Sequence, residues 1–138
     1  MYMLDSDVCI NCMRGKDRDV FNRIISLKPA NFKISAVVLA ELWFGVEHSN
    51  AKEANATILE IFLNDFEIAP FDVACAKAYS KIREDLSSKG RLIGLNDMLI
   101  AATAIANDAT LISNHIREYA RVPSLKVESW SVERMHGN

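Results

Sequence analysis

The side chains of this 138-residue chain that best suit chemistry are four carboxylates far apart in the sequence. Asp5 follows an apolar run, Glu41 lies inside another, and Asp97 and Glu118 flank two more. Carboxylates brought close together raise one another's pKa unless a divalent cation offsets their repulsion. Oxygen ligands suit Mg²⁺ or Mn²⁺, which can activate water and stabilise charge on a phosphodiester. The four acids therefore predict a metal site of the kind that phosphoryl-cleaving enzymes use.

Each acid alone also has a structural interpretation. Asp5 could simply cap a helix, and Asp97, in a predicted first helical turn, gains stability from the helix dipole. Glu41 is harder to explain in this way, because a charge in an apolar setting needs a partner or a metal. Its neighbours in the predicted helix are apolar: Val38, Leu39, Leu42 and Trp43. The joint pattern is therefore stronger than any of its members.

Short apolar strands alternate with helical segments, which predicts an α/β fold with a mainly parallel sheet. The predicted strands are 1–4, 32–34, 67–69, 110–113 and 125–128, and the predicted helices are 8–14, 19–27, 37–47, 51–66, 73–88 and 98–106. Ser35, Asp72 and Asn96 are placed to cap the helices that follow them. Ligands of such sheets bind beyond the carboxyl ends of the strands, so we expect the acids to converge at that edge.

Length and composition predict one domain, residues 1–132, followed by a C-terminal tail at 133–138. No apolar run reaches the roughly 20 residues that span a bilayer, and no signal peptide is evident. A cytoplasmic protein without a membrane partner is therefore expected. The net charge of −2 is unusual for a protein that binds nucleic acid through a basic surface. A divalent metal in an acidic pocket would reverse the local sign of the charge.

Cys9 and Cys12 form a C-x-x-C pair, but the sequence favours buried, unreactive thiols. The odd count of three cysteines argues against a disulfide framework. A redox pair needs an activated thiolate, and a zinc site needs two further ligands. The three histidines are isolated and show no ligand spacing.

Five stretches, taken in order, resemble motifs of the PIN-domain ribonucleases of the VapC toxin type over about residues 1–130. They are 3–7 (MLDSD), 34–35 with 41–45 (IS and ELWFG), 82–91 (IREDLSSKGR), 94–102 (GLNDMLIAA), and 111–122 with 127–130 (LISNHIREYARV and VESW). Any one of these is a weak signal, whereas their order and spacing together are specific. The resemblance implies a three-layer α/β/α sandwich and a Mg²⁺- or Mn²⁺-dependent endoribonuclease.

By position, Asp5, Glu41 and Asp97 match the three acidic metal ligands of that family. Ser6, Ser35 and Ser113 match its hydroxyl positions, and we expect Asn96 and Asn114 to support the site. Many relatives carry an aspartate where this chain has His115, and the resemblance implies that Glu118 completes the acidic set instead. Asp7 also departs from the common asparagine, and it either adds a carboxylate or caps the helix at Val8.

The resemblance also implies partners. Its substrate would be structured RNA cut in a single-stranded loop, and in the closest subtype the anticodon loop of initiator tRNA. An antitoxin would neutralise the enzyme, and homodimerisation is implied as well. The apolar residues Leu42, Trp43, Phe44, Ile58, Ile61 and Phe62 would form a groove for an amphipathic partner segment or be buried in the chain's own core.

Two other functions remain open at this point. The opening run also resembles the first motif of haloacid-dehalogenase-type phosphatases, with Asp5 as nucleophile and Asp7 as acid/base. That alternative leaves Glu41 and Glu118 without a role, and the glycine that usually follows the motif is absent. The other alternative is a PIN-like module that binds RNA or a partner without cleaving.

Overall fold

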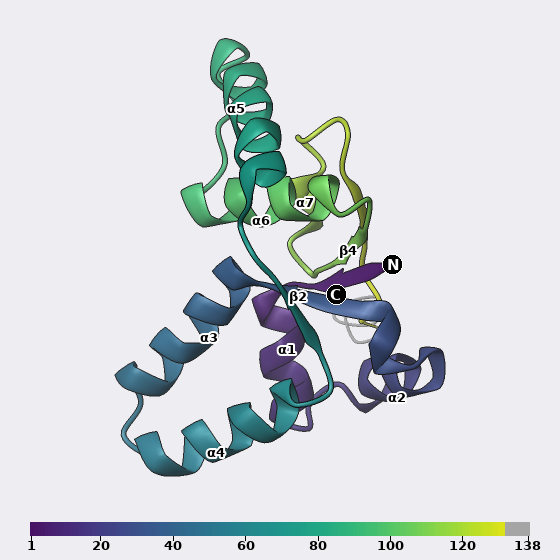
Figure 1. Cartoon of the computed structure of the whole chain (residues 1–138), viewed down its shortest axis with the longest axis vertical. Helices are drawn as coiled ribbons and strands as arrows, with labels where there is room; N and C mark the ends of the chain where they lie inside the picture. Colours follow the sequence, from purple (N-terminus) through teal and green to yellow (C-terminus); the bar gives the residue numbers. More distant parts are fainter. Residues whose placement is uncertain (132–138) are drawn as a thin grey trace.

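The computed structural model describes residues 1–131, which form a five-stranded sheet flanked by helices (Figure 1). The strands are β1 (Tyr2–Leu4), β2 (Phe32–Ser35), β3 (Glu67–Ala69), β4 (Thr110–Ile112) and β5 (Lys126–Glu128). All four strand pairings are parallel, and the strand order is β3-β2-β1-β4-β5. The predicted parallel sheet is therefore confirmed, and the predicted tail at 133–138 lies outside the described residues.

Seven α-helices and one 3-10 turn connect and cover the strands in this part of the chain. They are α1 (Ser6–Met13), α2 (Arg18–Leu27), η1 (Pro29–Asn31), α3 (Ala36–His48), α4 (Lys52–Leu63), α5 (Val73–Ser88), α6 (Leu95–Ala106) and α7 (Ile116–Tyr119). The caps predicted for α3 and α5 are confirmed: Ser35 Oγ accepts the Val38 N–H at 3.0 Å, and Asp72 Oδ1 accepts the Cys75 N–H at 3.1 Å.

Two details of the helix prediction are wrong. Asn96 does not cap α6, because the helix begins earlier, at Leu95, and Gly94 holds the cap position. Asn96 therefore lies in the first turn, where its side chain is free for a tertiary contact. The short helix α7 was not predicted, because four residues are too few to show a helical period.

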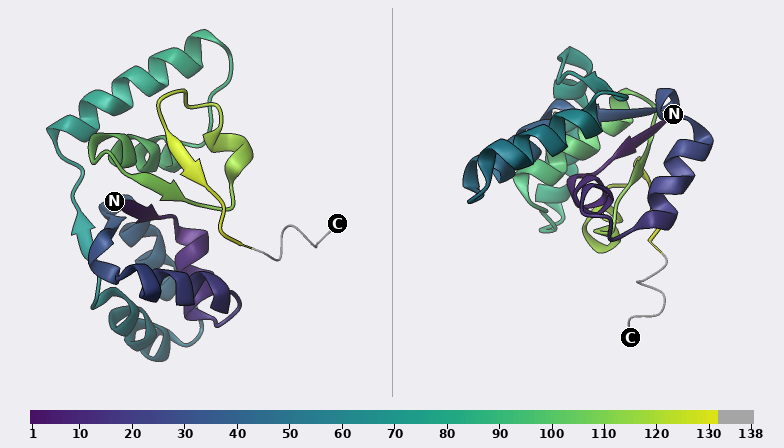
Figure 2. Two further views of the ribbon diagram at one scale, coloured as in Figure 1. Left: turned by 90° about the vertical axis from the view of Figure 1, so that its right-hand side faces the viewer. Right: turned by 90° about the horizontal axis from the view of Figure 1, so that it is seen from below.

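The order of the strands places a topological switch point at β1. The chain passes from β1 outward to β2 and β3, and then returns to the other side of β1 to form β4 and β5. In Figure 2 (left), the arrows of β1, β4 and β5 point the same way, so their carboxyl ends share one edge. Crevices at such switch points are where open α/β sheets bind ligands. Asp5 follows β1 directly and thus lies at this point.

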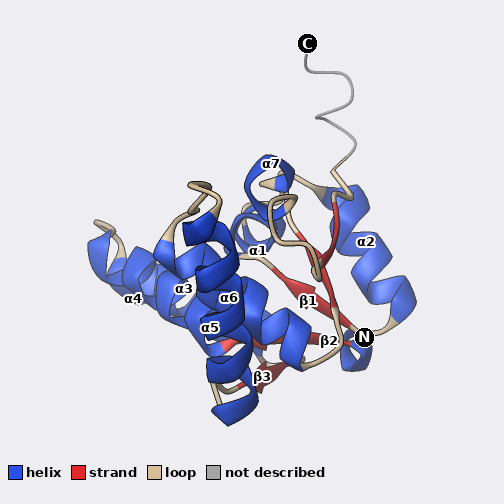
Figure 3. Ribbon diagram, turned by 90° about the horizontal axis from the view of Figure 1, so that it is seen from above, coloured by secondary structure: helices blue, strands red, loops and turns tan. Residues whose placement is uncertain are grey.

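Helices lie on both sides of the sheet, with α5 and α6 on one side and α2 on the other (Figure 3). This arrangement confirms the predicted three-layer sandwich. The core is formed by apolar residues of the strands together with the inner faces of the helices, and α6 is buried on most of its surface. Within residues 1–131, no helix has the length and apolar character needed to cross a membrane.

The paired helices α3 and α4 extend away from the sheet (Figure 1). Both carry exposed apolar side chains. Phe44 is 66% exposed and Ile61 is 69% exposed, and Ile58 is exposed as well. Leu42 and Val46 on the other face of α3 are buried. Of the two alternatives that the sequence allows, Leu42 follows the buried one, whereas Phe44, Ile58 and Ile61 are available to a partner.

Candidate active site

Asp5 lies at the switch point as a buried, hydrogen-bonded carboxylate. It caps α1 through Oδ1, which accepts the Ser6 N–H at 2.9 Å. Its Oδ2 accepts a hydrogen bond at 2.7 Å from Ser113 Oγ, at the end of the neighbouring strand β4. Only 2% of Asp5 is exposed, and burial raises its pKa to about 6 although Ser113 and Ser6 oppose the shift. The prediction that Asp5 caps a helix is therefore confirmed, and its role as a site residue stays a prediction that its position at the switch point supports.

Asp97, in the first turn of α6, is the carboxylate around which the other acids gather. Burial raises its pKa, and the negative charges of Glu41 and Glu118 raise it further. The Tyr119 hydroxyl, donating to Asp97 Oδ1 at 3.3 Å, and the charge of His115 act in the opposite direction. Glu41 and Glu118 thus lie close enough to the start of α6 to act electrostatically on Asp97, and the N-terminus of a helix favours negative charge.

Tyr119 connects this group to Asp5, and sequence reasoning did not identify it as a site residue. Its side chain is fully buried, and its hydroxyl also opposes the upward shift of the Asp5 pKa. Burial and the charges of Asp5 and Asp97 raise the pKa of Tyr119, so the phenol keeps its proton and remains a donor. A tyrosine next to a candidate site glutamate, in a segment too short to define a face, gave no periodic signal.

Glu41 enters the site from α3 with one oxygen bound and one left without a partner. Its Oε2 accepts a hydrogen bond from Asn96 Nδ2 at 3.3 Å. Asn96 can make this tertiary contact because it lies inside the first turn of α6 and does not cap the helix. Its Oε1 is buried and has no hydrogen-bond partner among residues 1–131. A buried carboxylate oxygen without a donor is costly, so this atom is a position where a bound cation would lower the free energy.

The predicted hydroxyl and amide positions divide between site and scaffold. Ser113 contacts Asp5 directly, whereas Ser35 is used as the cap of α3 and Ser6 offers its backbone N–H to Asp5. Asn114 lies further out, where its side-chain oxygen accepts from Ser129 Oγ at 3.1 Å. Of these positions, Ser113 and Asn96 are the ones whose side chains orient an acid of the site.

Asp7 holds two backbone segments together. Its Oδ1 accepts the Val8 N–H at 2.8 Å, and its Oδ2 accepts the Asn114 N–H at 3.0 Å. His115 Nε2 is 3.9 Å from Asp7 Oδ2 and its side chain is half exposed. Both oxygens of Asp7 are therefore engaged in fixing the start of α1 against the segment after β4, which favours the structural interpretation over an additional catalytic carboxylate.

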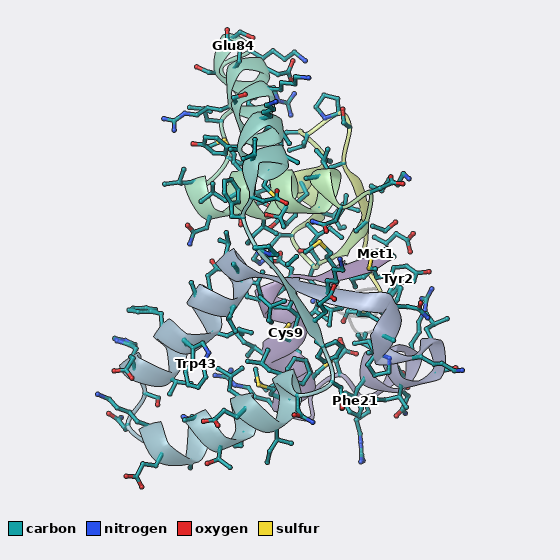
Figure 4. The ribbon with its side chains drawn as sticks, in the orientation of Figure 1. Met1, Tyr2, Cys9, Phe21, Trp43 and Glu84 are labelled. Atoms are coloured by element: carbon teal, nitrogen blue, oxygen red, sulfur yellow. The ribbon has the colours of Figure 1, made fainter. Side chains whose placement is uncertain are left out.

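The two cysteines of the C-x-x-C pair are free thiols, and Cys9 is buried as predicted, whereas Cys12 is only half-buried. Cys9 is fully buried on α1 in the interior of the molecule (Figure 4). Burial raises its pKa well above the usual value and raises that of Cys12 to about 12. Neither thiol forms a thiolate near neutral pH, which excludes an activated redox pair.

The four carboxylates, which we call the acidic edge, suit a hard divalent cation by their chemistry. Among residues 1–131, no three His, Cys, Asp or Glu side chains are grouped tightly enough to ligate one ion as they stand. Closure around an ion would therefore need rotation of side chains. Within the part of the chain that the structure describes, Asp5 and Asp97 have raised pKa values and Glu41 Oε1 has no partner, so negative charge here is not fully compensated. All the donors are oxygens, and such a set fits Mg²⁺ or Mn²⁺ better than zinc.

A polar hollow opens beside the acidic edge, between α7 and the segment that follows β5. Its volume is about 670 Å³. It is lined by Asn114, His115, Ile116, Arg117, Glu118, Ser129 and Ser131. Polar side chains and the Arg117 guanidinium thus lie beside Glu118 in this hollow. A ligand with several phosphates would require such hydrogen-bond donors.

Residues 2–124 match the PIN domain family. The chain is 42% identical over 131 residues to "Ribonuclease VapC2" of Rickettsia felis, covering 94% of this chain and 98% of the relative. It is 34% identical over 130 residues to the "tRNA(fMet)-specific endonuclease VapC" of Shigella flexneri, with coverages of 94% and 98%.

The fold is similar to solved toxin–antitoxin structures. The structure of VapBC2 from Rickettsia felis bound to a promoter DNA fragment contains a chain with a TM-score of 0.89 and 41% identity, covering 94% of this chain and 98% of that chain. DNA-bound VapBC from Salmonella typhimurium gives a TM-score of 0.88 and 32% identity, with coverages of 94% and 97%.

Proposed function

This chain belongs to the PIN-domain family and to its VapC ribonucleases, and from that membership we propose that its acidic edge holds Mg²⁺ or Mn²⁺ and cleaves RNA internally. The observation that carries the metal dependence is the convergence of Glu41 and Glu118 on Asp97, with Tyr119 linking Asp97 to Asp5. Four acids from four different elements have no structural need to meet in this way, because each could face solvent.

In this mechanism Asp5, Glu41 and Asp97 would hold the cation. The ion would lower the pKa of a bound water and stabilise charge on the phosphodiester. Ser113 fixes Asp5 and Asn96 fixes Glu41 by the hydrogen bonds described above. Glu118 acts electrostatically on Asp97 and also lines the polar hollow, so it would complete the acidic set where the RNA backbone enters.

The substrate we propose is an RNA that presents a single-stranded loop, with tRNA as the first candidate. A relative is named for cleavage of tRNA(fMet), and the polar hollow offers His115 and Arg117 to phosphates. The net charge of −2 gives the chain no overall attraction to a long duplex. A short contact next to the acidic edge therefore fits this surface better than an extended one.

A protein antitoxin is the proposed partner, and the α3–α4 pair is the surface that would bind it. A groove of about 210 Å³ runs between α1, α3 and α4, bordered by Met13, Glu41, Gly45, Ile58 and Leu59. Ile58 exposes apolar area in this groove, and Phe44 and Ile61 expose more elsewhere on the same helix pair. An amphipathic helix lays its apolar face into such a groove. Because Glu41 lines the same groove, a partner seated in it would reach the acidic edge.

The test is cleavage of total cellular RNA by the purified chain, with Mg²⁺ or with chelator, followed by mapping of the new ends. Defined ends that need Mg²⁺ are expected from the wild-type chain and not from Asp97→Asn. The matched control is Asp85→Asn, since Asp85 is an acid that pairs with Lys89 on the surface of α5. Cleavage at the parental rate by Asp97→Asn would refute the assignment, and binding without cleavage would support the scaffold alternative.

The phosphatase alternative loses its basis. Its acid/base, Asp7, has both oxygens engaged by backbone N–H groups, and the family match assigns the chain to another fold. The homodimer stays a prediction, and sedimentation of the purified chain would test it.

A further inference from the structure

The Tyr119 hydroxyl is a buried polar group whose position packing alone does not explain. The ring is fully buried, and phenylalanine would fill the same volume without the cost of removing a hydroxyl from water. Tyrosine is stable at such a place when its hydroxyl has a partner. Here the hydroxyl donates to Asp97 Oδ1 at 3.3 Å, and it also lowers the pKa of Asp5.

Each of the two aspartates has its own set of donors. Asp5 already receives the Ser6 N–H and the Ser113 hydroxyl, whereas Tyr119 is the side-chain donor to Asp97 among the described residues. A hydroxyl carries one proton, so Tyr119 cannot donate fully to both carboxylates at once. The separation of 3.3 Å exceeds the usual length of about 2.7–2.8 Å for an O–H···O bond.

We propose that Tyr119 is a positioning residue of the metal site, whose hydroxyl holds the Asp97 carboxylate beside Asp5 in the orientation that receives the cation. This inference rests on the proposed metal-dependent function. Residues that hydrogen-bond a metal ligand fix its direction and raise its affinity for the ion. Tyr119 comes from α7 after β4, whereas Asp97 comes from α6, so the hydroxyl also ties the two elements together at the site.

The first experiment measures the affinity of the full-length chain for Mn²⁺ by isothermal titration calorimetry. Tyr119→Phe removes one oxygen and keeps the ring, and we expect the affinity for Mn²⁺ to fall by about tenfold or more. Tyr79→Phe is the matched control, because the Tyr79 hydroxyl also has a partner, Arg83 at 2.6 Å, on the exposed face of α5. Thermal unfolding in chelator separates a loss of positioning from a loss of folding.

The proposal requires that Tyr119→Phe weakens Mn²⁺ binding while Tyr79→Phe does not. Wild-type affinity in a folded Tyr119→Phe chain would overturn it. If the wild-type chain itself binds no Mn²⁺ and cleaves no RNA, the proposed function fails first, so the two failures are distinguishable.

A second measurement uses the wild-type chain and does not depend on how the variant folds. Mg²⁺ is colourless, and its arrival beside Asp5 and Asp97 changes the field at the Tyr119 hydroxyl. We expect a tyrosine ultraviolet difference spectrum on addition of Mg²⁺ to the wild-type chain and to Tyr79→Phe. A saturating Mg²⁺ titration without any tyrosine signal would overturn the proposal.

Discussion

The acidic edge and the α3–α4 pair each contain an unfavourable feature, which is buried charge at the first and exposed apolar surface at the second. At the acidic edge, charged oxygens are buried: Asp5 is 2% exposed, and Glu41 Oε1 has no donor within residues 1–131. On the α3–α4 pair, apolar side chains are exposed instead, with Phe44 and Ile61 about two-thirds open to solvent. Both arrangements raise the free energy of the isolated chain, since burial of charge and exposure of apolar area are each unfavourable.

The difference teaches what kind of ligand each region requires. Buried negative charge is compensated by a small cation, whose field acts over a short distance. Exposed apolar area is compensated by a large apolar surface, because that stabilisation grows with the area covered. Since α3 carries both Glu41 and Phe44, a partner that covers one region also lies close to the other.

The sharpest way to break this comparison is Asp97→Asn, which removes the charge around which the acids gather. We expect RNA cleavage to fall by about a thousandfold, because metal stabilisation of the transition state is worth several kcal/mol. Rates of Mg²⁺-dependent cleavage measure the effect, and far-ultraviolet circular dichroism checks the fold. A variant that keeps its rate would show that this edge is structural only.

The pH dependence of the unfolding free energy, measured in the presence of chelator, tests whether the charge of Asp5 is compensated without a metal. Its pKa of about 6 lies above the usual value near 3.8, so the folded state binds a proton that the unfolded state releases. The resulting stability is fully present below about pH 4 and is lost as pH rises through 6, by as much as about 3 kcal/mol. Urea unfolding of the wild-type chain and of Asp5→Asn, at pH 5 and pH 7, measures this.

Asp5→Asn should remove this part of the pH dependence and be the more stable chain at pH 7. Equal slopes against pH in the two chains would mean that Asp5 is already compensated within the fold. Addition of Mg²⁺ at pH 7 should raise the stability of the wild-type chain and leave Asp5→Asn nearly unchanged.

Phe44→Ala tests the apolar side of the comparison. We expect it to weaken binding of an antitoxin by about 2 kcal/mol, roughly 30-fold, as for a buried aromatic anchor, without slowing RNA cleavage. The probe is the antitoxin component of the related Rickettsia felis complex, titrated by calorimetry. Glu60→Ala, an exposed polar position on α4, is the control. Equal affinities for Phe44→Ala and the control would place the partner elsewhere.

Ser35→Ala gives the smallest expected effect and separates scaffold from site. Ser35 caps α3 and contacts none of the four acids through a hydrogen bond among the described residues. Loss of the cap should cost about 1 kcal/mol of unfolding free energy and leave the affinity for Mn²⁺ unchanged. Chemical unfolding and calorimetry measure the two quantities, and a drop in affinity would assign the hydroxyl to the site.

The sequence by itself determined the alternation of strands and helices, the edge of the sheet to which the acids belong, and the caps at Ser35 and Asp72. These features depend on neighbours within a few residues or on the parallel connection of strands, so a local pattern carries them. The tertiary structure decided which side chains act together. Asn96 reaches Glu41 across 55 positions, and Tyr119 reaches Asp97 from another element. Such contacts join segments that have no common period, and only the packing of α3, α6 and α7 around the end of β1 brings them within hydrogen-bond distance.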